Sequence, residues 1–347
     1  MNPLSKLKNL YTLAADVKQP KIFSFHDCLP DVFSKYLELL IYRRYRVLDL
    51  SEATDRMRGE GSFKKEVVLT FDDGRRNGWT IIFPLLKKYK IKASFFIIPS
   101  RIKDSEEYYP NLEDYWNGRV SWENLYVSHR RQPHLTWKEL SIMQESGLVD
   151  VFSHSLRHEV TSVSPTIIDF QHPGVYEMPV YFDEWFKAGE ALFEMIWGAP
   201  IYERVWAPLA SNVYMPNPKV DIFMNEFVRQ NGGFLFFKKK NWRKSLLDYF
   251  SQHKRDFDPG HFKRIENKEE ASVSMLESKE TIEKRLHNSC LFFSLPLYQD
   301  FPGMMKMAQA SGYHAVLAGP SSVCHENSKV FLFKKFPSFW IKFLTYF

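Results

Sequence analysis

Two short clusters of polar residues, each directly after an apolar run, carry side chains that could perform metal-assisted chemistry. Asp72 and Asp73 follow one run and precede a glycine, a pattern typical of a buried strand that delivers two carboxylates to its C-terminal tip. His154 and His158, four residues apart, follow the other run. One Asp with two His supplies three ligands and leaves open positions for water and substrate, as in a catalytic divalent metal site.

The residue types divide the work between ligands and base. Asp73, His154 and His158 are the predicted metal ligands, and Asp72 is left to act as a base. The donor set suits zinc, cobalt, nickel and iron, with zinc as the first expectation. A His pair at this spacing is more often two surface residues of a helix, but the upstream Asp-Asp-Gly argues against that interpretation. For Asp72, a second ligand or a strand-end cap stays as the alternative.

The two clusters resemble the first two motifs of the polysaccharide deacetylase family, metal-dependent carbohydrate esterases with a NodB-like domain. Thr70–Gly74 matches the family's Thr-Phe-Asp-Asp-Gly, and His154–His158 matches its His-Ser/Thr-x-x-His. The segment Ile22–Asp27 resembles the Tyr-His-Asp segment of the subgroup that cleaves N-acetyl groups from exopolysaccharides, with Phe25 in place of Tyr.

The resemblance implies a role for each matched residue. Asp72 takes the proton from the attacking water, and a metal polarises the amide carbonyl. His26 is the general acid, because the amide nitrogen must be protonated as the C–N bond breaks. Asp27 is expected to orient the His26 imidazole. The alternative for His26 is a core histidine whose hydrogen bonds are satisfied.

A third family motif, aromatic-x-Tyr-Pro-Tyr-Gly, is only partly matched by Phe293–Tyr298. In the family a backbone N–H beside its Pro-Tyr contacts the oxyanion, and the resemblance transfers this role to Leu297. A backbone donor survives any side chain, but the aromatic wall and the glycine are lost. Val205–Ala210 is a second, weaker echo of the motif, and the downstream match is preferred.

Strand-like and helix-like segments alternate over residues 20–160 and 275–335, which indicates an α/β fold. Trp79–Ser100 is expected to form an amphipathic helix, with Ile81, Ile82, Leu85 and Leu86 at helical spacing, and then a strand over Ala93–Ile98. Thr136 with Glu139 forms a capping-box pattern. Read with the family, this is an irregular, partly closed (β/α) barrel with an inserted helical and loop subdomain. The expected division is 20–163 and 272–347 for the barrel and 164–271 for the insert.

Two stretches interrupt the alternation. Lys103–His134 is polar and aromatic, and is expected to form a long loop or short helical excursion over the site. In the insert, helices are expected at Val220–Val228 and Trp242–Phe250. Their predicted apolar faces comprise Ile222, Phe223, Phe227, Leu246, Leu247 and Phe250.

Composition excludes some classes of function. The net charge of +6 over 347 residues is mild and does not indicate a nucleic-acid partner. The densest basic patch, Lys238–Lys240 with Arg243 and Lys244, could face an anionic glycan, a sugar nucleotide or phospholipid headgroups, or be a plain solvated surface. Aromatic residues make up 16% of the chain, which suits a heavily packed core with Trp and Tyr open to sugar stacking.

Cys28, Cys290 and Cys324 show neither metal-ligand spacing nor a disulfide framework. The segment Met1–Lys8 lacks the apolar core of a signal peptide, and no run approaches the length of a membrane span. These features predict a reduced, cytoplasmic protein. The segment Phe331–Phe347 is either a final strand and helix on the sheet or an interfacial segment at the inner membrane face, since it combines aromatics with lysines.

The sequence therefore predicts a metal-dependent hydrolase that removes an N-acetyl or other N-acyl group, formyl included. The expected substrate is an amino-sugar glycan or a lipid- or nucleotide-linked precursor. The alternatives are a catalytically impaired glycan-binding protein of the same fold and a membrane-surface protein.

Overall fold

The computed structural model describes residues 18–59, 62–125, 133–173, 196–265, 270–323 and 328–346. The chain divides into two compact units. The first comprises Met1–Arg157 and Ala271–Phe347, and the second comprises His158–Glu270. The second unit thus begins six residues before the predicted insert. Each unit has its own sheets and apolar core.

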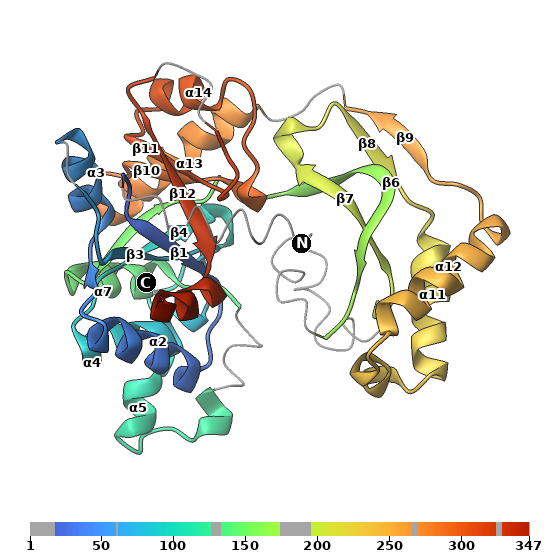
Figure 1. The fold of residues 1–347 in the computed structure, drawn as a ribbon, viewed down its shortest axis with the longest axis horizontal. Helices are drawn as coiled ribbons and strands as arrows, with labels where there is room; N and C mark the ends of the chain where they lie inside the picture. The colour runs from blue at the N-terminus through green and yellow to red at the C-terminus, as the bar shows by residue number, and fades with distance from the viewer. Residues whose placement is uncertain are drawn as a thin grey trace. The chain divides into compact units, whose positions relative to one another are not determined.

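The first unit is built on a closed parallel barrel (Figure 1). Within the described residues, seven parallel strands follow one another in the order β1-β12-β11-β10-β5-β4-β3, and pairing of β1 with β3 closes the ring. The short β2 pairs with the start of β3. The strands are β1 Lys21–Phe25, β2 Arg46–Val47, β3 Glu66–Phe71, β4 Ala93–Ile97, β5 Val149–Ser153, β10 Phe292–Ser294, β11 Ala315–Ala318 and β12 Phe331–Pro337. The predicted (β/α) barrel is confirmed, and its ring is complete.

Helices surround the barrel strands (Figure 1). They are α2 Pro30–Tyr42, α3 Leu50–Arg58, α4 Phe83–Tyr89, α5 Leu112–Trp116, α7 Trp137–Glu145, α13 Ala271–Leu286 and α14 Met304–Ala310. The element η1 Gly78–Ile82 is a π-helical turn. The 3-10 helices described in this unit are η2 Pro99–Arg101, η6 Pro296–Tyr298 and η7 Ser338–Tyr346. Strands of a parallel barrel are buried on both faces and are therefore mainly apolar. In β3 every residue is buried, including the polar Glu66 and Thr70.

Local sequence explains where several of these helices begin. Pro30 occupies the first turn of α2, where its missing N–H costs nothing. The predicted capping box of α7 is confirmed: Thr136 Oγ1 accepts from Glu139 N at 3.1 Å, and Glu139 Oε2 accepts from Thr136 N at 2.9 Å. The helix predicted between Trp79 and the strand at Ala93 is present, but its first part, η1, is a π-helical turn. Pro84 cannot donate to the i−4 carbonyl, and this loss favours the wider turn just before it.

The second unit contains more strand than the sequence predicts. Antiparallel pairs join β6 Val160–Phe170 to β7 Pro200–Trp206, and β8 Asn212–Met215 to β9 His261–Arg264. The other elements are η3 Ala207–Leu209, α11 Pro218–Gln230, η4 Gly233–Lys238, α12 Trp242–His253 and η5 Lys254–Asp256. The expectation of a helical and loop insert is therefore incomplete. Register shifts interrupt the pairing of β6, which contains Pro165 and lacks regular alternation, so the strand pattern is hidden in the sequence.

The two helices predicted in this unit are present, but part of their predicted apolar face is wrong. Ile222 is 71% exposed and Leu247 is 48% exposed. The buried face of α11 instead follows Val220, Met224 and Val228, whose spacing of four residues keeps them on one side of a helix. Ile222 lies about 200° around the helix axis from Val220, which places it on the solvent side.

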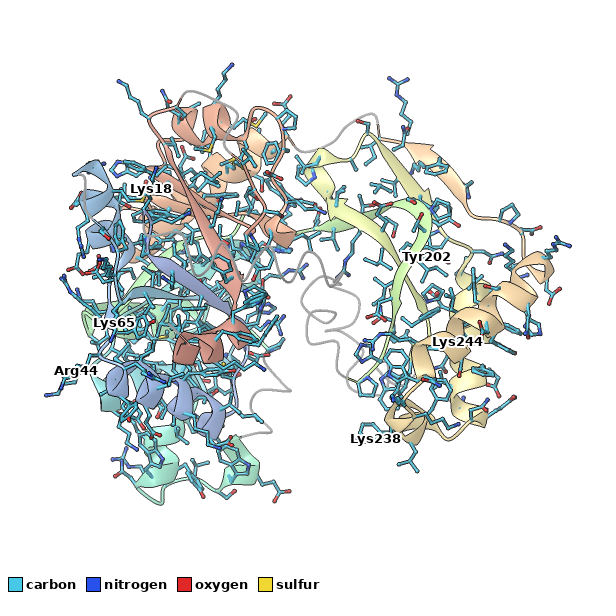
Figure 2. All side chains as sticks on the ribbon, in the orientation of Figure 1. Lys18, Arg44, Lys65, Tyr202, Lys238 and Lys244 are labelled. Carbon is cyan, nitrogen blue, oxygen red and sulfur yellow. The ribbon has the colours of Figure 1, made fainter. Side chains whose placement is uncertain are left out.

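The basic patch of this unit is an exposed surface. Figure 2 labels Lys238 and Lys244 on the second unit, and both side chains are exposed. Arg243 forms a forked ion pair with Asp169 at 2.9 and 3.2 Å, and Lys244 lies 3.5 Å from Asp248. These pairs neutralise part of the patch and favour the interpretation as a solvated surface.

The C-terminal segment packs on the barrel. Trp340 is 2% exposed, while Ile341 and Leu344 are fully buried, and η7 contacts β1. Of the two alternatives for this segment, packing on the sheet is the one observed. None of the described helices is both long enough and apolar enough to cross a bilayer. Cys28 and Cys290 are free thiols, and Cys324 and Met1–Lys8 lie outside the described residues.

Candidate metal and catalytic site

Three barrel strands deliver four of the predicted site residues at their C-terminal ends. His26 follows β1, Asp72 and Asp73 follow β3, and His154 follows β5. The parallel register pairs Phe25 with Phe71, the last residues of β1 and β3. Because parallel strands end at the same rim of a barrel, these side chains meet there.

Asp73, His154 and His158 form a buried group of metal-ligand type. One donor atom from each residue lies within 4.8 Å of the others. Asp73 Oδ1 lies 3.6 Å from His154 Nε2, close to the separation of about 3.4 Å between donors of a tetrahedral ion with bonds of about 2.1 Å. His154 Nδ1 contacts the Ser294 carbonyl at 2.8 Å, so its N–H points away from the cluster and leaves Nε2 as the ligand atom. These residues fit a divalent metal.

The backbone is strained at the cluster. Asp73 has φ 73° and His158 has φ 54°, values that residues with a Cβ rarely adopt. Gly74 also has positive φ, and a Cβ there would lie 2.8 Å from the Ile102 side chain. Only glycine fits after the Asp pair, which explains the Asp-Asp-Gly sequence. His158 lies only four residues along the chain from His154, and this short link keeps the two imidazoles near each other.

Asp72 is held as a carboxylate by three hydroxyl and ammonium groups. Its Oδ2 accepts from Lys335 Nζ at 2.5 Å and from Ser24 Oγ at 2.8 Å, and Oδ1 accepts from Ser294 Oγ at 3.5 Å. Burial alone raises the pKa of this carboxyl. The Lys335 ammonium, with help from His154 and His26, outweighs burial and holds the pKa of Asp72 below its ordinary value. Asp72 is therefore ionised and able to accept a proton.

His26 lies next to the cluster but is not oriented as expected. Its Nε2 is 3.7 Å from Asp73 Oδ2, and its side chain is 22% exposed. Asp27, predicted to orient the imidazole, instead accepts from Arg75 Nη1 at 3.0 Å. Arg75 also contacts Asp73 Oδ2 through Nε and Nη2, at 3.1 and 3.0 Å. Arg75 thus bridges the two aspartates and turns Asp73 Oδ1 toward His154.

Leu297 lies in the η6 turn directly after β10, the strand whose Ser294 contacts both Asp72 and His154. The turn is unusual, since Leu297 has φ 56° and Tyr298 has φ 60°. The alternative match at Val205–Ala210 belongs to β7 and η3 of the second unit. The downstream segment is therefore the one that belongs to the barrel.

Sequence reasoning missed Lys335 and Arg75. Lys335 is 1% exposed on β12, where the strand's alternation puts it in phase with Phe331 and Phe333. A lysine in phase with the buried Phe333 is the signal that could have identified it, because a buried lysine requires an anionic partner.

His134 is a further buried histidine beside the cluster. Burial, opposed by Asp73 and supported by Arg75, Arg101 and Arg76, lowers the pKa of His134 to about 3. The imidazole is therefore neutral at physiological pH. The backbone carbonyl of His134 accepts a hydrogen bond from Arg76 Nη2 at 2.7 Å, and this bond links the segment before α7 to the segment that follows the Asp-Asp-Gly turn.

Fold and site together define a parallel (β/α) barrel with an Asp-His-His cluster and a second carboxylate at the C-terminal rim. Residues 60–171 match the family model described as polysaccharide deacetylase. The resemblance indicated by the two motifs is confirmed over this part of the chain, which contains both of them.

Several solved structures match most of the length of this chain. A de-N-acetylase from Aggregatibacter actinomycetemcomitans is 16% identical, with 92% of this chain and 95% of that chain covered and a TM-score of 0.48. IcaB from Ammonifex degensii is 14% identical, with coverage of 94% and 96% and a TM-score of 0.49. The Streptococcus pyogenes deacetylase PplD, solved with acetate, is 13% identical, with coverage of 95% and 98% and a TM-score of 0.48. No protein with a curated description matches the chain.

Proposed function

We propose that this protein is a metal-dependent hydrolase that removes an N-acetyl group from an amino-sugar glycan or its precursor. The observation that carries the proposal is the convergence of Asp73, His154 and His158 beside Asp72, a carboxylate kept ionised by Lys335. A divalent ion, zinc first among the candidates, would polarise the amide carbonyl and acidify a water molecule there. The match to the polysaccharide deacetylase model supports the substrate class.

Each side chain then has a defined task. Asp72 accepts a proton as water attacks the acyl carbon, and the Leu297 N–H donates to the oxygen that becomes negative. As the C–N bond breaks, His26 gives its proton to the nitrogen, so that acetate and a free amine leave. Lys335 and Ser24 keep Asp72 oriented and charged between turnovers.

The first test compares the metal content and thermal stability of the purified protein with those of His154→Ala. We expect about one divalent ion per chain in the parent and a marked loss in the variant, because one of three ligands is removed. Added zinc should raise the melting temperature of the parent alone, since a ligand that binds the native state stabilises it.

A second step separates activity from metal binding. The zinc-loaded parent should release acetate, or formate, from acylated amino sugars, and Asp72→Asn should keep its metal while losing at least about 100-fold in rate. A metal-loaded parent inert toward every acylated sugar would favour a glycan-binding protein that has lost turnover. Equal metal content in the parent and His154→Ala would sink the metal-hydrolase proposal.

A further inference from the structure

A groove on the barrel unit is walled by aromatic side chains that remain exposed. Tyr115, Trp116 and Trp122 are 42%, 46% and 42% exposed. The groove has a volume of about 390 Å³, within the range of small-ligand sites, about 300–1,000 Å³. The polar side chains that share it are Asp31, Ser34 and Lys88.

The aromatic wall is held in place by its own contacts. Helix α5 begins with a complete capping box between Asn111 and Asp114. Its Glu113 forms an ion pair with Lys87 of α4 at 2.7 Å, and Leu112 is buried beneath it. Tyr115 and Trp122 pack edge to face with their ring centroids 5.6 Å apart. Because these exposed aromatic side chains are already ordered, they lose little conformational entropy when a ligand stacks on them.

The segments that line the groove are close in the chain to the catalytic residues or contact segments that follow them. Helix α2, which supplies Asp31 and Ser34, starts four residues after His26. On the other side, the segment that leads to α5 is tied to the Asp-Asp-Gly turn. Tyr109 stacks on the Arg76 guanidinium at 4.0 Å, and its carbonyl accepts from Trp79 Nε1 at 2.5 Å.

We propose that this groove is a subsite for the sugar chain that extends from the catalytic centre, and this inference rests on the proposed deacetylase function. The C–H face of a sugar ring stacks on an aromatic ring, while hydroxyl groups need donors and acceptors at the edge of the platform. Trp116 and Trp122 supply platforms, and Asp31, Ser34 and Lys88 supply those hydrogen-bonding groups. Lys88 Nζ lies over the Trp116 ring, 5.6 Å from its centroid, where the ammonium can donate to a hydroxyl of a sugar on that platform.

The test is isothermal titration calorimetry with the N-acetylglucosamine pentamer and the free monosaccharide. The double variant Trp116→Ala/Trp122→Ala should bind the pentamer at least tenfold more weakly than the parent, with monosaccharide binding unchanged. Tyr42→Ala is the matched control, because Tyr42 is 81% exposed at the far end of α2, outside the groove, and should bind as the parent does. Circular dichroism and melting temperature verify that each variant is folded.

Failure of the subsite and failure of the proposed function give different results. Loss of metal without loss of pentamer binding in His154→Ala would leave the subsite intact whatever the outcome for catalysis. Equal pentamer affinity in the parent and the folded double variant overturns the subsite, as does a parent that binds no pentamer. A double variant that changes only its self-association, measured by analytical ultracentrifugation, also overturns it and makes the groove a contact between copies of the chain.

Discussion

Lys335 and Asp72 form a buried ion pair whose partners lie on β12 and directly after β3, at 1% and 2% side-chain exposure. Each charge is expensive to bury alone, and their mutual attraction with Ser24 and Ser294 offsets that cost. The pair therefore fixes the base and leaves the molecule sensitive to the loss of either partner.

Replacing Lys335 by Met should affect both activity and stability. The variant leaves a buried carboxylate without its cation, which we expect to cost roughly 3–5 kcal/mol in the free energy of unfolding. The rate of deacetylation should fall at least about 100-fold, because without the Lys335 ammonium the buried Asp72 carboxyl holds its proton and is no longer fixed in place. Urea unfolding and acetate release at pH 7 measure the two effects, and metal content should stay at the parent value.

The double variant Asp72→Asn/Lys335→Met is the control for this interpretation. It removes both charges, so it should be more stable than Lys335→Met while still inactive. If Lys335→Met unfolds within about 1 kcal/mol of the parent, the pair does not carry the stability assigned to it.

At the residue scale, the sequence predicts the candidate metal ligands but not the side chains that orient them. Asp73 and His154 stand directly after apolar strands, so local pattern and residue type suffice to find them. Lys335 and Arg75 act through partners far away in sequence or folded back by a strained turn. The closed register of the barrel brings Lys335 of β12 to Asp72 after β3. The alternation of β12 can indicate that Lys335 is buried, but it does not identify Asp72 as its partner.

At the element scale, the start of α7 illustrates a feature that local sequence does determine. Thr136 is fully buried, and its hydroxyl accepts from Glu139 N at 3.1 Å. Thr136→Ala should therefore destabilise the protein by about 1 kcal/mol, the usual loss when a helix cap is removed. Thermal unfolding measures the change.

Thr281→Ala provides the matched comparison. Thr281 lies inside α13, and its hydroxyl donates only to the Glu277 carbonyl one turn earlier. Alanine is the better helix former at such a position, so the variant should be as stable as the parent or slightly more stable. If both variants lost the same free energy of unfolding, the cap of α7 would contribute no more to stability than the Thr281 hydroxyl does.

Helix caps and strands can be predicted from local sequence, whereas the buried faces of the helices in the second unit cannot. The buried stripe of α11 runs through Val220, Met224 and Val228, yet Ile222 and Phe223 are as apolar in the sequence. Which side is covered depends on the packing of Phe170 and Leu246 against the helix, and both belong to distant segments. The helices could be predicted, but their buried faces could not be fully assigned.

At the scale of the whole molecule, stability must respond to pH through groups whose pKa changes on folding. Asp221 of α11 is such a group, because burial raises its pKa from 3.8 to about 6. It lines a cavity of about 380 Å³ together with Tyr202 and Tyr214. A carboxyl with a raised pKa binds its proton more tightly in the folded state than in the unfolded state. The folded state is therefore penalised as the pH rises from about 4 to about 6, and the penalty persists above that range.

Asp221→Asn should remove this penalty. Two pKa units correspond to roughly 3 kcal/mol as an upper limit, so we expect the variant to exceed the parent by about 1–3 kcal/mol at pH 7.5. At pH 4 the two proteins should be nearly equal, because Asp221 is then largely protonated in the folded parent. Urea unfolding of both proteins at pH 4, 5, 6 and 7.5 measures the difference.

Asp248→Asn, at an exposed site on α12, is the control, and its free energy of unfolding should stay within about 0.5 kcal/mol of the parent at every pH. Parallel curves for Asp221→Asn and the parent would contradict the role of Asp221, whereas a gap that opens between pH 4 and 6 identifies it.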